Sequence, residues 1–243
     1  MDRQAKRRLA IYVSLALFPA TFYYMSPILI IMGAYEGLVV GSALTFAAMF
    51  LLSLYLGRAF CGWACPMAGL QEACARKRNR RVEGRKKDMI KYAIWAPWMA
   101  IIVLTALIGE GIHDASPLYQ TVAGISILGT GAPFTLLIFV GIVVAVALGV
   151  GQRAFCHCGC WMAPFMVFGT SARDRLGLPG LRIVSDKSKC TSCKKCTKNC
   201  SMSLDVNAMV QKGSMRNSEC VLCGTCADGC PKGAIVFSFG RAS

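Results

Sequence analysis

Fourteen cysteines in a chain of 243 residues are the side chains whose type and spacing suggest chemistry. Eight of them form two runs near the C-terminal end, each with the spacing C-x2-C-x2-C-x3-C, and Pro231 follows the second run. Three thiolates on one tight loop hold three corners of a cubane, and the fourth cysteine of the run ligates the other cluster. The spacing therefore predicts two [4Fe–4S] clusters.

The exchange of the fourth cysteine divides the eight thiols into two ligand sets. The first set is Cys190, Cys193, Cys196 and Cys230, and the second is Cys220, Cys223, Cys226 and Cys200. Ser201 stands where the first run would carry its proline, which removes no ligand. Structural zinc is the alternative, since C-x2-C pairs also bind zinc. Because the eight cysteines have no partner histidine, the pattern favours iron–sulfur clusters over zinc.

A second repeat contains C-x3-C pairs. One copy begins Arg58-Ala59-Phe60-Cys61, the other begins Arg153-Ala154-Phe155-Cys156, and the two align without a gap through Met67 and Met162. Two helix–loop units that cross the membrane in the same direction can be related by an axis along the membrane normal. We therefore expect a third [4Fe–4S] site, or alternatively ordinary buried thiols. The four candidate ligands are Cys61, Cys65, Cys156 and Cys160.

The repeat spacing does not assign a role to some residues near these cysteines. Cys74 and Cys158 do not align with each other, and His157 lies among the cysteines of the second copy. Arg58 and Arg153 would either offset the negative charge of a thiolate-bound cluster or act as anchors that extend toward the membrane surface.

Apolar segments must position these cysteines. Hydrophobic residues make up 55% of the chain and charged residues 16%, whereas soluble domains carry about a quarter charged residues. Four apolar runs approach the ~20 residues that cross a ~30 Å hydrocarbon layer. A signal peptide is the alternative for the first run, and residues 28–36 are expected to form a short re-entrant or interfacial stretch. The predicted spans cover residues 9–24, 38–56, 89–108 and 132–150.

The basic residues indicate how these spans are oriented. The segment from Arg58 to Lys87 contains nine Lys and Arg residues, its two ends and Arg85 among them, whereas the loop from Glu110 to Gly131 has none. The N-terminus and the C-terminal tail are also basic. By the positive-inside rule we expect a multi-pass protein of the cell (inner) membrane with both termini cytoplasmic. The net charge of +15 then reflects topology and contact with anionic lipid, and nucleic-acid binding is not expected.

These patterns predict a membrane domain joined to a small tail domain. Residues 1–170 are expected to form an all-α membrane domain of four transmembrane helices in a 2+2 repeat. A linker at 171–181 contains Gly177, Pro179 and Gly180. Residues 182–243 are expected to form a small α+β domain of the bacterial 2[4Fe–4S] ferredoxin type, with a pseudo-symmetric β-α-β-β-α-β order.

From about Leu38 onward the chain resembles the membrane polyferredoxins similar to NapH, the iron–sulfur quinol-dehydrogenase subunit of periplasmic nitrate reduction. That group includes the C-terminal half of the nitrous-oxide reductase regulator (NosR) and the FixG-type cytochrome-oxidase accessory protein. Residues 61–66 match its C-x3-C-P motif, whereas Trp161 replaces the proline after the second pair. The resemblance implies electron transfer at the membrane.

The sequence lacks dinucleotide and P-loop motifs, and its two histidines lie far apart, so no pair is available for haem within the bilayer. We expect an electron-transfer subunit rather than a self-contained enzyme. It would relay electrons between a cytoplasmic redox partner and the quinone pool or a membrane complex. An acidic soluble carrier would suit the basic tail. The alternatives are a factor that supplies electrons for maturation of another metalloenzyme, and a redox sensor.

Overall fold

The computed structural model describes the whole chain except residues 1, 83–85, 110, 130 and 242–243, so Arg85 and Glu110 lie outside the described residues. Helix α1 (Arg3–Thr21), a 3-10 turn (Phe22–Met25) and helix α2 (Pro27–Tyr35) form one long helical stretch. The apolar segment after Pro27 is thus a helix that starts on proline at its first position, where a missing N–H costs nothing.

The two copies of the C-x3-C repeat form the same succession of three helices. The first copy consists of α3 (Gly41–Leu56), α4 (Ala59–Trp63) and α5 (Pro66–Lys77). The second consists of α7 (Ala132–Gly149), α8 (Ala154–Cys158) and α9 (Ala163–Arg175). Helix α6 (Lys86–Ile108) joins them. In each copy a long apolar helix is followed by a short helix that carries cysteine and then by a helix of 12 or 13 residues.

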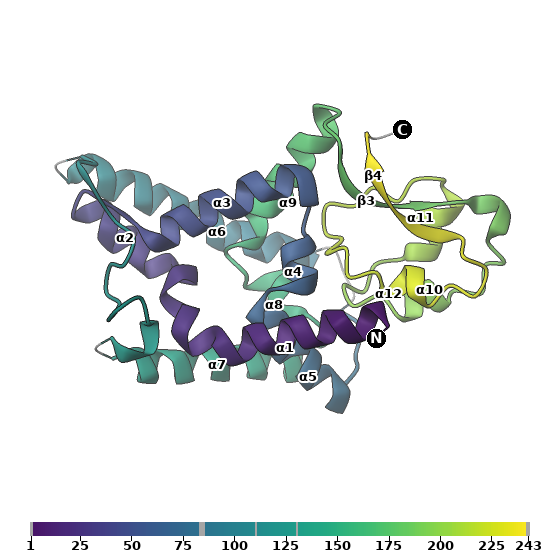
Figure 1. The fold of residues 1–243 in the computed structure, drawn as a ribbon, viewed down its shortest axis with the longest axis horizontal. Coiled ribbons are helices and arrows are strands. Elements are labelled where there is room, and N and C mark those ends of the chain that lie inside the picture. Colours follow the sequence, from purple (N-terminus) through teal and green to yellow (C-terminus); the bar gives the residue numbers. More distant parts are fainter. Residues whose placement is uncertain (1, 83–85, 110, 130, 242–243) are drawn as a thin grey trace.

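The two copies pack crosswise. Helix α3 of the first copy packs on α9 of the second, and α7 of the second packs on α5 of the first. The long helices run side by side along the longest dimension of the molecule, and the short helices α4 and α8 lie between them at the end nearest the tail (Figure 1). This exchange brings both cysteine pairs to the centre of the helical part.

In its described residues the tail contains one pair of strands, three short α-helices and a 3-10 turn (Lys187–Lys189). Strands β3 (Gly180–Ser185) and β4 (Ile235–Gly240) pair antiparallel, with Ile183 opposite Phe237. The helices are α10 (Lys195–Lys198), α11 (Val206–Gln211) and α12 (Thr225–Asp228). The α+β composition agrees with the expectation. The two inner strands do not form in the described residues, and the side chain of Asp205 caps α11 in that segment instead.

Two predicted boundaries are wrong. Residues Leu38–Val40 form strand β1, which pairs parallel with β2 (Asp114–Ser116), so the second apolar helix starts at Gly41 and has 16 residues. β-Branched Val39 and Val40 favour extended backbone. Helix α9 continues to Arg175, into the first half of the expected linker, which leaves a connection of only residues 176–179 before β3.

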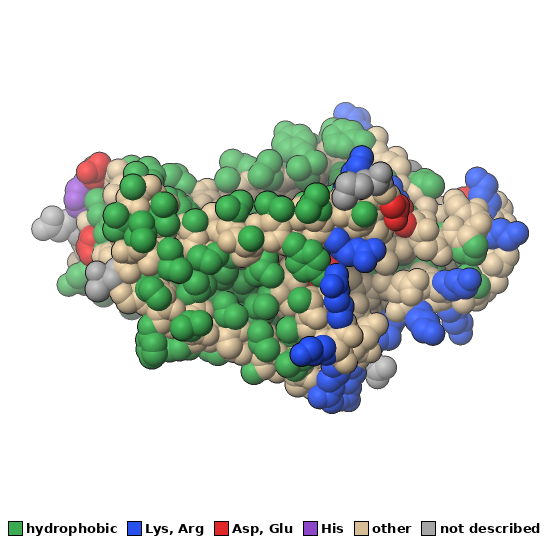
Figure 2. All heavy atoms as spheres, turned by 60° about the horizontal axis from the view of Figure 1, so that its bottom comes forward, with side chains coloured by type: hydrophobic (Ala, Val, Ile, Leu, Met, Phe, Trp, Pro, Cys, Tyr) green, Lys and Arg blue, Asp and Glu red, His purple; other side chains and the backbone are tan. Residues whose placement is uncertain are grey.

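The helical part is apolar on its outside. Within the described residues three helical stretches are long and apolar enough to cross a membrane, namely Arg3–Tyr35, Lys87–Ile108 and Ala132–Gly149, and α3 is apolar but shorter. Leu107, Phe134 and Leu137 are among its exposed side chains. Figure 2 shows hydrophobic side chains, in green, over the helical part, and Lys and Arg side chains, in blue, gathered around the tail and the adjoining helix ends.

Gly62 permits the close contact between the helical part and the tail. A Cβ atom at this position would overlap the backbone carbonyl oxygen of Val221 in the tail, and backbone cannot move aside as a side chain can. We predict that Gly62→Ala separates the tail from α4, although alanine favours helix. Limited proteolysis should then cleave the connection at 176–179 faster. Gly141→Ala, in α7 with nothing within 4 Å of the added atom, is the matched control, and equal cleavage of both variants would contradict the prediction.

Candidate iron–sulfur sites

The twelve cysteines predicted as ligands line three separate cavities, four to each. The four members of each predicted set come together although they lie up to 99 residues apart in the chain. We call the cavities the distal, middle and inner cavity, in order of approach to the apolar helices. The distal cavity contains Cys190, Cys193, Cys196 and Cys230; the middle cavity Cys200, Cys220, Cys223 and Cys226; and the inner cavity Cys61, Cys65, Cys156 and Cys160.

The inner cavity is built by the crosswise packing of the two repeats. Cys61 and Cys156 lie on the short helices α4 and α8, and the other two cysteines follow directly after those helices. Apolar side chains such as Phe18, Phe139 and Trp161 complete its wall. Cys61 and Cys156, the first cysteines of the two C-x3-C pairs, are buried.

The residue six positions after each C-x3-C pair contacts the other pair. Gln71 follows Cys65 by six and its Nε2 donates to Cys156 Sγ over 3.3 Å. Met166 follows Cys160 by six and its Sδ lies 3.4 Å from Cys61 Sγ. The contacts are symmetric but their chemistry is not, because one side has an N–H donor and the other a thioether. Gln71 and Met166 occupy equivalent positions in the repeat alignment, and this equivalence is the sequence signal for the two contacts.

Four cysteine sulfurs around each cavity match the ligand number of a cubane cluster, and structural zinc also takes four cysteines. Within the described residues no three His, Cys, Asp or Glu side chains already converge on a point that could hold a metal ion. Burial raises the pKa of the Cys65 and Cys160 thiols, and neighbouring cysteine sulfurs add to the shift. A positively charged metal group in this cavity would stabilise the thiolates, and its binding would release protons.

Two arginines at equivalent repeat positions are fully buried beside the inner cavity. Arg58 Nη1 bonds Glu219 Oε2 over 2.6 Å, and the same oxygen accepts from Lys91 Nζ over 2.6 Å. Arg153 is paired with Glu72, and its Nη1 donates to the carbonyl of Cys61 over 2.7 Å. Both arginines are 0% exposed. The interpretation as anchors that extend to the membrane surface is therefore wrong, and the electrostatic one remains.

The tail lies directly against the inner cavity. Trp63 Nε1, on α4, donates to the carbonyl of Leu222 over 3.0 Å, and Gln4 Nε2, on α1, donates to the carbonyl of Cys223 over 3.0 Å. A single hydrophobic core contains cysteines of all three cavities; these are Cys61, Cys156, Cys196, Cys200, Cys223 and Cys226. No layer of solvent separates the helical part from the tail at this point.

The leftover candidates lie outside the cavities. Cys158 donates to the carbonyl of Ala154 within its own helix, and Cys74 lies on α5. His157 Nδ1 is 2.5 Å from Asp88 Oδ1. None of the three lines the inner cavity. Glu72 and Glu219, the carboxylates that pair with the buried arginines, gave no signal in the sequence because their partners are remote in the chain.

The fold and the cysteine sites define an iron–sulfur protein with 4Fe–4S binding domains. The model of a "4Fe-4S binding domain" matches residues 38–85 and 132–179, which are the two repeat copies, and the model of a "4Fe-4S dicluster domain" matches residues 189–235. The domain matches support [4Fe–4S] clusters as the cofactor.

Several proteins are similar in sequence to this chain. The "putative electron transport protein YccM" of Escherichia coli is 28% identical over 77% of the chain and 53% of its own length. MJ0749 of Methanocaldococcus jannaschii is 23% identical over 82% of the chain and 72% of its own length. Protein RdxA of Cereibacter sphaeroides is 24% identical over 93% of the chain and 48% of its own length. The chain thus spans about half the length of YccM and RdxA. No solved structure matches it.

Glu72 provides the test of the buried ion pairs. Its carboxylate accepts from Arg7 Nη1 over 2.8 Å and is paired with Arg153. Glu72→Gln leaves two buried guanidiniums without their counter-ion, which costs about 3 kcal/mol and lowers the melting temperature by about 10 °C. Thermal unfolding in detergent measures the change. Glu36→Gln, an exposed carboxylate that accepts only from Tyr119 in the described residues, is the control and should change little; equal melting temperatures for both variants would refute the prediction.

The same ion pairs imply a pH dependence of stability. Burial alone would raise the pKa of Glu72, but Arg153 and Arg7 lower it overall. A carboxyl whose pKa is lowered on folding contributes stability that is complete above its ordinary pKa and is lost as the pH falls through the lowered value. Wild-type melting temperatures should therefore fall below about pH 4.5 more steeply than those of Glu72→Gln, and parallel curves would argue against this assignment.

Proposed function

We propose that the chain is a membrane-anchored iron–sulfur electron-transfer protein with three [4Fe–4S] clusters, one in each of the three cavities. The observation that carries this proposal is the shared core, in which cysteines of the distal, middle and inner cavities pack together. Electron transfer between clusters requires short separations through packed protein, and the contacts of Leu222 and Cys223 with the helical part supply such a connection.

The membrane part of the proposal is a four-span arrangement in which α1, α3, α6 and α7 cross the bilayer. The apolar exterior of these helices supports it, as does the concentration of Lys and Arg at the end that contains the tail (Figure 2). Under the positive-inside rule that end, with both termini, faces the cytoplasm. Helix α3 would cross with 16 residues, and neighbouring basic residues such as Arg58 are buried at its end rather than in lipid.

The order of the cavities suggests the path of the relay, in either direction. The distal cavity is lined by Lys189, Lys194 and Lys195, so an acidic soluble carrier would dock there, chiefly through an increased association rate. The inner cavity, beside Phe18 and Phe139 of the apolar helices, would exchange electrons with a quinone or a membrane complex. The clusters, when bound, supply one-electron chemistry, and the chain supplies their spacing and electrostatic surroundings.

The similarity to YccM supports electron transport as the activity, and the NapH-like resemblance supports a membrane partner. The FixG-type resemblance keeps a role in the maturation of another metalloenzyme as the alternative. Quinol-dependent reduction of the purified protein would favour the relay, whereas loss of a metal cofactor from another enzyme in a deletion strain would favour maturation.

Iron counting tests the number and location of the clusters. Protein purified without oxygen should contain about twelve iron atoms, since each cubane holds four. A variant with Ser in place of the four inner cysteines, Cys61, Cys65, Cys156 and Cys160, should retain about eight. A Cys74→Ser, Cys158→Ser variant is the matched control and should keep all twelve. Eight irons in every preparation would remove the inner cluster from the proposal.

The asymmetry between Gln71 and Met166 predicts the potential of the inner cluster. A hydrogen bond to a ligand sulfur stabilises the more negative, reduced state. Gln71→Met removes that bond, worth about 1 kcal/mol, and should lower the midpoint potential by about 40 mV. Redox-titrated EPR measures it, with the signal assigned by its absence from the four-serine variant. Met166→Leu, which removes no donor, should leave the potential nearly unchanged; a potential that is the same in wild type and Gln71→Met would overturn the assignment.

A further inference from the structure

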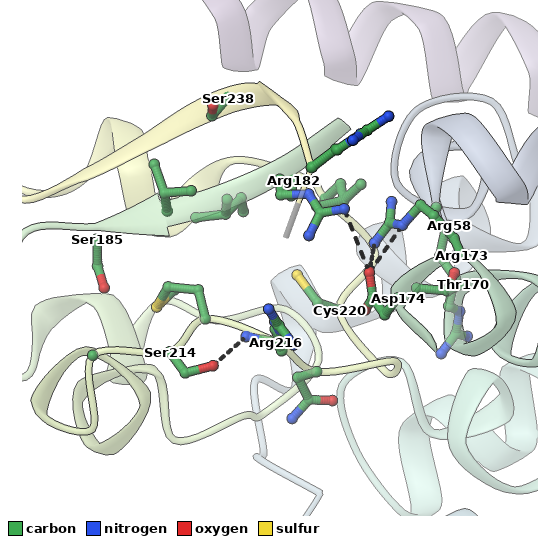
Figure 3. A pocket seen from close by; sticks show the side chains of 18 residues that line it. Arg58, Thr170, Arg173, Asp174, Arg182, Ser185, Ser214, Arg216, Cys220 and Ser238 are labelled. Atoms are coloured by element: carbon green, nitrogen blue, oxygen red, sulfur yellow. Dashed lines mark hydrogen bonds and ion pairs between the residues drawn. The ribbon is translucent and has the colours of Figure 1, made fainter. Parts of the chain in front are cut away.

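A cavity of about 220 Å³ lies at the junction of α9, strand β3 and the tail segment that leads to Cys220. Figure 3 shows its side chains, of which several from different elements point toward one another. Five arginines line it and a single aspartate opposes them; the arginines are Arg58, Arg173, Arg182, Arg216 and Arg241. Thr170, Ser185, Ser214 and Ser238 add hydroxyl groups. We call it the arginine cavity.

In the arginine cavity Arg173 and Arg182 carry more positive charge than Asp174, their shared carboxylate, neutralises, whereas Arg58 is already paired with Glu219. Asp174 Oδ1 lies 3.0 Å from Arg173 Nη2 and 3.6 Å from Arg182 Nη2, so two guanidiniums share one carboxylate. Burial lowers the pKa of Arg182, and repulsion from Arg173 and Arg216 adds to the shift. Such an accumulation of like charge is unfavourable unless an anion compensates for it.

Two buried polar atoms at this cavity also have no partner within the described residues. They are Arg182 Nε and Ser185 Oγ, which come from the same strand, β3. Buried donors are paired in nearly all folded proteins, and an exception calls for an explanation such as a bound ion. Arg182 Nε can only donate and Ser185 Oγ can donate as well as accept, so an acceptor group would satisfy both atoms.

We propose that the arginine cavity binds a phosphate group. Guanidinium forks match phosphate oxygens in geometry, and the doubly charged group accepts several hydrogen bonds at once, which suits the arginines and hydroxyls that surround it. The cavity is smaller than most sites for whole organic ligands, so it holds the phosphate itself. The phosphate belongs either to the headgroup of an anionic lipid or to a soluble compound.

The surroundings are compatible with both sources. Two exposed apolar side chains lie beside the cavity in the chain. Tyr55, at the end of α3, is two positions before the lining residue Gly57, and Leu176, at the end of α9, is two positions after the lining residue Asp174. Lipid tails could therefore cover this side while the headgroup enters. The opposite wall belongs to the polar tail, from which a soluble compound would enter. This inference does not depend on the clusters of the proposed function.

The experiment uses the full-length protein in detergent micelles and isothermal titration calorimetry at constant chloride. Inorganic phosphate is titrated in one arm and a short-chain phosphatidic acid in the other. Binding in both arms indicates a site open to soluble phosphate, and binding of phosphatidic acid alone identifies the lipid headgroup. Either result supports the phosphate site, whereas no saturable binding in either arm overturns it.

Variants locate the site. Arg182→Gln removes charge-assisted hydrogen bonds and should weaken binding at least tenfold, and Ser185→Ala, which changes only one hydroxyl, should weaken it by a smaller factor. Arg175→Gln removes the same charge from the exposed end of α9, outside the cavity, and should bind as the wild type does. If Arg175→Gln and Arg182→Gln weakened binding equally, the binding would depend on overall surface charge and not on the cavity, and the proposed site would be refuted. If Arg182→Gln does not fold, Ser185→Ala serves as the test, and an affinity equal to that of the wild type would refute the site.

Discussion

The fold depends on the burial of charge beside an apolar helical core. Arg58 and Arg153 are completely buried, and each is held by a carboxylate from a distant part of the chain. Removing an unpaired charge from water costs several kcal/mol, so these arginines can be buried only if their partners are in place. Glu219 belongs to the tail and Glu72 to α5. The ion pairs therefore tie the correct packing of the repeats and the tail to the formation of the inner cavity.

The crosswise packing explains why the cysteine pairs occur on two separate helix–turn–helix units. A single C-x3-C turn can present only two sulfurs to one side, and a four-cysteine site needs a second such turn facing it. The exchange of α9 onto α3 and of α5 onto α7 provides that facing arrangement. It also lets α5 and α9 each place a side chain on the opposite pair, as Gln71 and Met166 do. Because Gln71 donates a hydrogen bond and Met166 does not, the two repeats give their cysteine sulfurs different electrostatic surroundings although their helices are arranged in the same way.

Part of this architecture was predictable from the sequence. Cysteine spacing predicted three sets of four, and each set lines one cavity, because ligand spacing is a local property of tight loops. The length of the apolar runs located the helices to within a few residues, except that α1 begins six residues earlier, at Arg3, and that Val39 and Val40 belong to a strand. Contacts between remote segments were not predictable. Nothing near Glu219 in the sequence indicates that its carboxylate meets Arg58 and Lys91, and only packing reveals the arginine cavity.

The first two turns of α1 show how one segment can serve two requirements. Arg3 and Arg7 lie before the first apolar run, where basic residues favour a cytoplasmic position. In the fold both have defined partners: Arg3 pairs with Asp228 of the tail, and Arg7 Nη1 donates to the carbonyl of Gly62 over 3.1 Å. Gln4 lies between them on the same helix and contacts the backbone of Cys223. Because a helix transmits its position rigidly along its length, these contacts fix the tail relative to the apolar helices, and the charges that favour one orientation also hold the middle cavity against the inner one.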